Sequence, residues 1–160
     1  MRHLLKNGFQ FTAVLADADY GSTGAFRRGL EHLGLRYAVG IRSDVRLRTA
    51  DRASARTARA IGTSIPEAEW QRVTWGHGTK GPLAARFVAR RVRPTKSPGE
   101  RWLVCERSLA DDSRKYYLLN LDATATLPDL VHLARSRWPI EQQYRELKDD
   151  LGFDHFEGRS

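Results

Sequence analysis

Short apolar runs and amphipathic stretches alternate over the first forty residues. Residues 11–17, FTAVLAD, and residues 35–41, LRYAVGI, are apolar runs of the length and composition of buried strands. Between them, residues 25–34 place apolar side chains at helical spacing and end in a glycine, as helices often do. This order predicts a βαβ unit. Such units carry functional groups at the carboxyl ends of their strands, and Asp17 lies at one such end.

The period of the pattern changes after residue 68. Between residues 68 and 121, apolar or alternating stretches are separated by segments rich in Gly, Pro, Asp and Ser. They predict an antiparallel meander of about four strands. Residues 42–62, just before it, are rich in Arg and Ala and predict a basic, partly ordered loop or short helix. That segment suits contacts with phosphates, and a solvated surface explains the same composition.

Helical spacing returns in the last third of the chain. One helix is predicted to begin near Pro128. The next stretch contains Arg137, Glu141 and Lys148, which an unbroken helix would place within an arc of about 40°. Proline suits the first turn of a helix and not its interior, so Pro139 allows either one helix or two that meet beside it. Taken alone, this pattern indicates a solvated helix face.

The charge of the chain indicates a class of partner when it is considered together with the motifs. The 160 residues include 27 Lys and Arg against 19 Asp and Glu, which gives a net charge of +8. An excess of this size is typical of proteins that bind a polyanion, most often nucleic acid. A basic protein from a GC-rich genome is the alternative. The hydrophobic content of 41% suits one globular domain with a sizeable core.

Composition also argues against several classes. No run of 18 apolar residues is present, which excludes a transmembrane helix, and the N-terminal residues lack the apolar stretch of a signal peptide. Cys105 is the single cysteine, so neither an internal disulfide nor a Cys–His metal site can form. We therefore expect a cytoplasmic protein that does not bind membranes.

The candidate chemistry depends on two acidic residues, Asp17 and Glu141. Asp19 is the alternative to Asp17, and it would share a strand face with Asp17 only if the strand continued that far. Carboxylates completed by phosphate oxygens are ligands that Mg²⁺ accepts. Two such ions about 4 Å apart stabilise the attacking and leaving oxygens in phosphodiester cleavage. The two carboxylates therefore predict a divalent-metal site, next to a basic surface that would hold the substrate.

These motifs together resemble the C-terminal part of a bacterial insertion-sequence transposase of the DDE class. Residues 14–21, VLADADYG, are similar to the strand of the family's second aspartate. Residues 75–94 resemble the β-rich insertion that some branches carry before the glutamate. Arg137, Glu141 and Lys148 fit the family signature of Arg, three residues, Glu, six residues and Lys.

The resemblance implies an α/β protein with a ribonuclease H-like fold. The fold would be incomplete, with its N-terminal strands missing, and would carry an inserted antiparallel β-block. Residues 1–62 would form the strand-helix-strand part of the core and a basic loop. Residues 63–125 would form the β-rich insertion, and residues 126–160 the helical part of the core with the catalytic glutamate.

The resemblance also implies roles for individual residues. Asp17 and Glu141 would be the catalytic residues and would bind Mg²⁺ in a two-metal site. Arg137, Arg145 and Lys148 would contact DNA phosphates, Arg through a bidentate fork and Lys as a point charge. The implied partners are transposon ends and target DNA, with a dimer in the synaptic complex.

Two features depart from the family pattern. Ala134 stands where the signature has a tyrosine, and no acidic residue occurs among the ten residues before the first strand. We therefore expect a copy truncated at both ends, with an incomplete metal site, an uncovered sheet edge and little strand transfer by itself. The alternatives are a non-catalytic DNA-binding remnant and a basic RNA-associated protein, although the latter lacks the aromatic sheet motif of common RNA modules.

Overall fold

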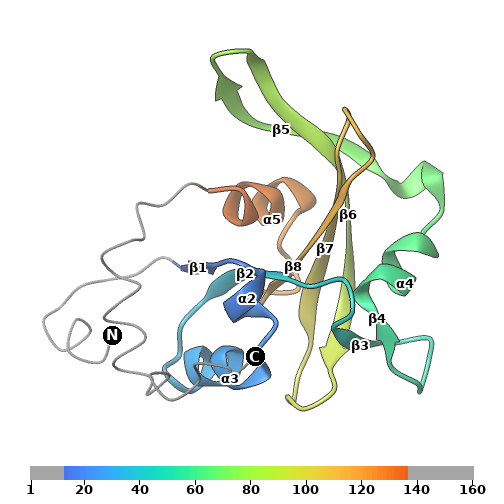
Figure 1. Ribbon diagram of the computed structural model, residues 1–160. Coiled ribbons are helices and arrows are strands. Elements are labelled where there is room, and N and C mark those ends of the chain that lie inside the picture. Colours follow the sequence, from blue (N-terminus) through green and yellow to red (C-terminus); the bar gives the residue numbers. More distant parts are fainter. Residues whose placement is uncertain (1–12, 137–160) are drawn as a thin grey trace, which may run out of the picture.

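The computed structural model describes residues 13–136, which form a curled sheet with helices on both faces (Figure 1). Its first elements are β1 (Val14–Ala16), the short helix α2 (Ala18–Gly21), α3 (Gly24–His32) and β2 (Tyr37–Ile41). β1 and β2 pair in parallel, so the predicted βαβ unit is confirmed. After α3 the backbone turns at Gly34, whose φ of +70° is a conformation that glycine adopts without steric cost.

The basic segment after β2 is more ordered than predicted. It contains β3 (Arg46–Thr49), β4 (Arg56–Thr57) and α4 (Ala58–Thr63). The short helix was one of the two expected forms, but neither strand was predicted. β3 pairs antiparallel with β4 on one side and with the distant strand β6 on the other, and its Leu47 is fully buried. Long-range pairing and one buried leucine therefore order a segment whose local composition resembles that of a loop.

The predicted meander follows the 3-10 turn η1 (Glu67–Glu69). Its strands are β5 (Gln71–Gly78), β6 (Gly81–Pro94), β7 (Arg101–Arg107) and β8 (Arg114–Leu119). Each strand pairs antiparallel with the next, which confirms the four-stranded meander.

β8 joins the meander to the βαβ unit. It pairs antiparallel with β2, which places Leu119 opposite Ala38 and Tyr116 opposite Ile41. The strand order is β1-β2-β8-β7-β6-β3-β4, with β5 also paired to β6. The carboxyl end of β2 therefore lies beside the amino end of β8, so residues about 75 positions apart in the sequence meet at one edge of the molecule.

The last described helix, α5 (Leu127–Ala134), begins where the sequence predicts. The hydroxyl of Thr126 accepts a hydrogen bond from the backbone N–H of Asp129, and the Asp129 carboxylate accepts one from the N–H of Thr126. This reciprocal capping box satisfies two backbone donors that have no partner within the helix.

The two faces of the sheet bury separate cores. α3 and α4 cover one face and α5 covers the other, so β2 and β8 lie in a middle layer (Figure 1). Fully buried side chains on the first face include Leu30, Tyr37, Val39, Leu47, Ile61, Val92, Leu103 and Leu118. Those on the second face are Phe87, Val104, Leu119, Leu130 and Val131.

Candidate active site

Asp17 lies directly after β1, at the carboxyl end of the strand, as the sequence predicts. It is the N-cap of α2. Its Oδ1 accepts hydrogen bonds from the backbone N–H groups of Asp19 at 3.1 Å and Tyr20 at 3.4 Å. The residue is exposed. Capping therefore fixes the orientation of an exposed carboxylate at the end of the strand.

Asp19 does not lie on β1, although a place on that strand was the condition for its being an alternative to Asp17. β1 ends at Ala16 and α2 begins at Ala18, so Asp19 lies in the first turn of a helix. It does not share a strand face with Asp17. A negative charge in a first turn is favourable, which gives Asp19 a local structural role.

Two glycines bring α2 onto β2 and so fix the turn that carries Asp17. A Cβ at Gly21 would lie 1.9 Å from the carbonyl oxygen of Gly40, and a Cβ at Gly40 would lie 3.1 Å from the backbone nitrogen of Ala18. The buried guanidinium of Arg27, on α3, donates to the carbonyl oxygen of Gly21. Burial lowers the pKa of Arg27. β2 and α3 therefore hold the turn from two directions.

A groove of about 770 Å³ opens beside this turn, at the carboxyl end of β2. Ala18 of α2 forms part of its wall, immediately after Asp17 in the chain. The charged side chains that line the groove are Arg42, Asp44, Arg59, Asp112, Arg114 and Lys115. Four cations and two carboxylates make the groove basic.

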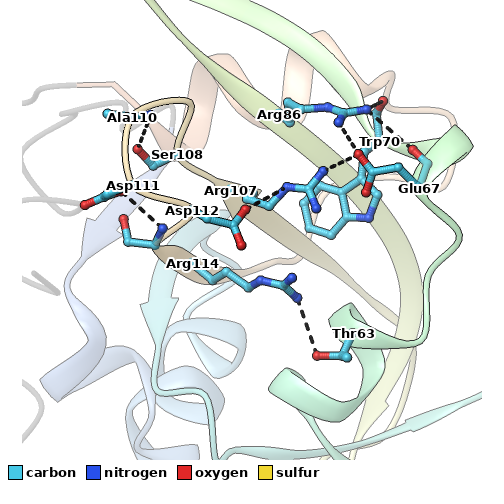
Figure 2. Close-up of polar contacts among 11 residues, drawn as sticks. Thr63, Glu67, Trp70, Arg86, Arg107, Ser108, Ala110, Asp111, Asp112 and Arg114 are labelled. Carbon is cyan, nitrogen blue, oxygen red and sulfur yellow. Dashed lines mark hydrogen bonds and ion pairs between the residues drawn. The ribbon is translucent and has the colours of Figure 1, made fainter.

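Another part of the groove's wall is α4. Arg59 and Thr63 are four residues apart and lie on the same side of this helix. Arg114, at the start of β8, donates to Oγ1 of Thr63 at 3.4 Å (Figure 2). α4 lies close to the sheet at Gly62, where a Cβ would be 3.2 Å from Sγ of Cys105. Close packing of helix on sheet therefore brings cations from two distant segments to one surface.

In an ionic cluster next to the groove, other cations are paired with carboxylates (Figure 2). Glu67 accepts hydrogen bonds from Arg86 and, at 2.6 Å, from Arg107. Arg107 also forms an ion pair with Asp112 at 3.3 Å, and its guanidinium lies 4.8 Å from the ring centre of Trp70. The hydrogen bond from Arg107 lowers the pKa of Glu67. The cluster fixes the turn between β7 and β8 and leaves Arg114 directed toward the groove.

The end of α5 is fixed by a second polar cluster on the other face. The buried carboxylate of Glu106 accepts a hydrogen bond from the Tyr117 hydroxyl at 2.8 Å and forms an ion pair with Arg135 at 3.7 Å. The Arg135 guanidinium lies 4.4 Å from the ring centre of Trp75. Burial, followed by the nearby Glu106 charge, raises the pKa of Tyr117. These contacts fix the C-terminal end of α5 against the sheet.

The remaining predicted site residues come after residue 136 in the sequence. Arg137, Glu141, Arg145 and Lys148 lie outside the described residues, so their roles stay predictions. The convergence of Asp17 and Glu141 on one metal ion stays a prediction for the same reason.

Asp17 fits a metal site as one contributing ligand. Within residues 13–136, no group of three or more His, Cys, Asp and Glu side chains is placed to hold a metal ion. Mg²⁺ does not need such a group, because it is commonly held by one or two carboxylates, with waters and substrate phosphates completing its shell. An exposed, oriented aspartate at a strand end suits that coordination.

The groove itself was not predicted. Arg42 and Arg59 belong to the basic segment for which phosphate contacts were considered. Arg114 and Lys115 reach the groove only because β8 pairs with β2, and no local sequence pattern indicates that pairing. The sequence therefore indicated Arg42 and Arg59 as candidate phosphate contacts, but not Arg114 and Lys115.

A parallel βαβ unit, a strand-end aspartate and an adjacent basic groove define an α/β protein suited to a phosphate-containing polyanion. The sequence profile of the DDE superfamily endonucleases matches residues 1–82, just over half of the chain. The chain belongs to this family, which confirms the resemblance to DDE transposases. Endonucleases of this family act on DNA, and the superfamily generally uses divalent metal ions. No curated protein and no solved structure matches the chain.

One further finding concerns membranes. None of the helices between residues 13 and 136 has the length and apolar character needed to span a bilayer.

Proposed function

We propose that this protein is a DDE transposase that cleaves and joins DNA strands at the ends of an insertion sequence, with Mg²⁺ as cofactor and a ribonuclease H-like core. The observation that carries the proposal is the position of Asp17. It is an exposed carboxylate, oriented by its own helix cap, at the carboxyl end of β1 within the part of the chain that matches the family. Strand ends in α/β folds are where such ligands act.

In this proposal Asp17 and Glu141 hold the metal ion. The bound ion would polarise the scissile phosphate and lower the pKa of the attacking water. Asp17 keeps its orientation because α2 is packed on β2 through Gly21 and Gly40. Arg137, Arg145 and Lys148 would hold phosphates of the transposon end and offset repulsion between the carboxylates and the DNA. A dimer would bring two ends together.

The test compares Asp17→Asn with Asp19→Asn in Mg²⁺-dependent cleavage of DNA that carries the end of the element. The chain is assayed together with a polypeptide that supplies the first acidic strand of the family. Asn caps a helix about as well as Asp, so Asp17→Asn removes the charge and keeps the fold. We expect Asp17→Asn and Glu141→Gln to abolish cleavage, and Asp19→Asn to retain it.

Two results would count against this assignment. Cleavage by Asp17→Asn at the wild-type rate would exclude the residue as a metal ligand. Loss of cleavage only in Asp19→Asn would transfer the role to that residue. DNA binding without cleavage by the wild-type mixture would favour the second candidate, a non-catalytic DNA-binding protein, which the basic groove also supports.

A further inference from the structure

A second hollow, of about 280 Å³, lies next to the groove beside Asp17. Arg42 and Asp44 line both, so the two hollows share one wall. The second hollow adds Arg28 of α3, Arg46 of β3 and Lys96 from the turn between β6 and β7. Together the two hollows form a basic surface, here called the phosphate track, that extends to either side of Arg42.

We propose that the phosphate track binds the sugar-phosphate backbone of DNA without regard to base sequence. The proposal rests on the proposed function in taking DNA as the polyanion. It adds a binding surface built from residues other than Arg137, Arg145 and Lys148, whose DNA contacts stay predictions.

The state of the cations is the first argument. Elsewhere on the sheet, several arginines are neutralised by carboxylates, as in the pairs of Arg90 with Glu69 and Arg101 with Glu31. Among the described residues, the track cations Arg28, Arg46, Arg59, Lys96, Arg114 and Lys115 form no ion pair. Unneutralised cations gathered on one concave surface attract a polyanion.

The orientation of these cations is the second argument. Arg59 donates to Oγ of Ser43 at 3.2 Å, and Arg114 donates to Oγ1 of Thr63 at 3.4 Å. Hydroxyl partners hold each guanidinium in place without cancelling its charge. A held guanidinium can still present its remaining N–H groups to a phosphate in a bidentate contact. Less side-chain entropy is then lost when DNA binds.

The composition of the track indicates which part of DNA it contacts. Tyr116 is the one aromatic residue among its described lining residues, and it is buried. Stacking of bases needs exposed aromatic side chains, whereas contacts of Arg and Lys to phosphate carry no sequence information. Ala18 lines the track next to Asp17, so a bound backbone would pass the proposed metal ligand.

The experiment measures binding of short DNA duplexes by fluorescence anisotropy over a range of salt concentrations. The track pair is Arg59→Gln with Arg114→Gln. The matched control pair is Arg72→Gln with Lys80→Gln, which removes the same charge from exposed positions on β5 and in the turn between β5 and β6. Each contact with a phosphate contributes about 0.9 to the slope of log K against log salt for duplex DNA.

We expect the track pair to lower that slope by about 1.8 and to weaken binding equally on transposon-end and unrelated sequences. The control pair should leave the slope nearly unchanged. Asp44→Asn, which removes a carboxylate from the middle of the track, should tighten binding. If the double variant does not fold, Lys115→Gln alone should lower the slope by about 0.9.

If the track and control pairs lower the slope equally, or if the track pair does not lower it, the phosphate track is overturned while DNA stays the substrate. A wild-type chain that fails to bind DNA even at low salt would overturn both the track and the DNA substrate. If the track pair lowers the slope as expected but Asp17→Asn cleaves DNA at the wild-type rate, only the assignment of Asp17 as a metal ligand is overturned.

Discussion

The contact between α2 and β2 predicts that even the smallest side chain at position 21 destabilises the protein. In Gly21→Ala the new Cβ would lie 1.9 Å from the carbonyl oxygen of Gly40 and 2.8 Å from Cβ of Val39. The first of these is a backbone atom in the sheet, so the overlap can be relieved only by moving α2. Overpacking of this kind costs about 3 kcal/mol, at the upper end of its usual range.

The gain that alanine brings within a helix offsets part of this cost. Replacing glycine by alanine at a compatible helical position contributes about 1 kcal/mol, so the net destabilisation is about 2 kcal/mol. For a chain of this size, that lowers the melting temperature by about 4–8 °C. Thermal unfolding followed by circular dichroism measures the change. The rate of DNA cleavage should fall too, because the backbone N–H groups of the displaced helix α2 orient the Asp17 carboxylate.

Gly76→Ala is the matched control. A Cβ at Gly76 would lie 3.8 Å from Cδ1 of Leu83, an ordinary contact, so this variant should melt at or slightly above the wild-type temperature. If Gly21→Ala and Gly76→Ala melt alike, α2 does not lie against β2 as described, and the positioning of Asp17 needs another explanation.

Three further outcomes test the fold. Leu118→Ala should lower the free energy of unfolding in urea by about 2–5 kcal/mol, because Leu118 is fully buried. Leu109→Ala should lower it by less than about 0.5 kcal/mol, because Leu109 is 51% exposed. Similar losses of stability in the two variants would contradict the burial of Leu118 in the core. Thr126→Ala should cost about 1 kcal/mol by removing the capping box of α5, and an unchanged urea midpoint would argue against that cap. Burial raises the pKa of Cys105 from 9.0 to about 12, so the unfolded chain loses the thiol proton first and stability falls as the pH rises through this range. Cys105→Ala should therefore lose less stability than wild type between about pH 8 and pH 11 in the same assay, and equal losses would place the thiol in solvent.

The elements that could be predicted are those whose signals are local. The apolar run before Asp17 and the glycine after α3 mark their elements within a few residues. Thr126 and Asp129 mark the start of α5 in the same way. Such signals act through backbone hydrogen bonds near the element itself, so they can be read from one stretch of sequence.

The elements that could not be predicted depend on partners far along the chain. β3 is a strand because Leu47 pairs with Pro94, almost fifty residues away. The groove forms because β8 pairs with β2, and its cations come from α4, from β8 and from Arg42 directly after β2. In the sequence these arginines resemble any others on a basic surface. Asp17 could be predicted as a strand-end residue, whereas its distance from Glu141 stays a prediction.

β6 is shared by three neighbours, and this determines how the protein opens. Its first half pairs with β5, its middle and second half pair with β7, and its last residues pair with β3. Around Arg86 and again at Val92, it has strands on both sides. Amide protons there can exchange with solvent only when more than one pairing is lost, so we expect slow hydrogen exchange at these positions of β6. The sheet should then unfold as one cooperative unit rather than hairpin by hairpin.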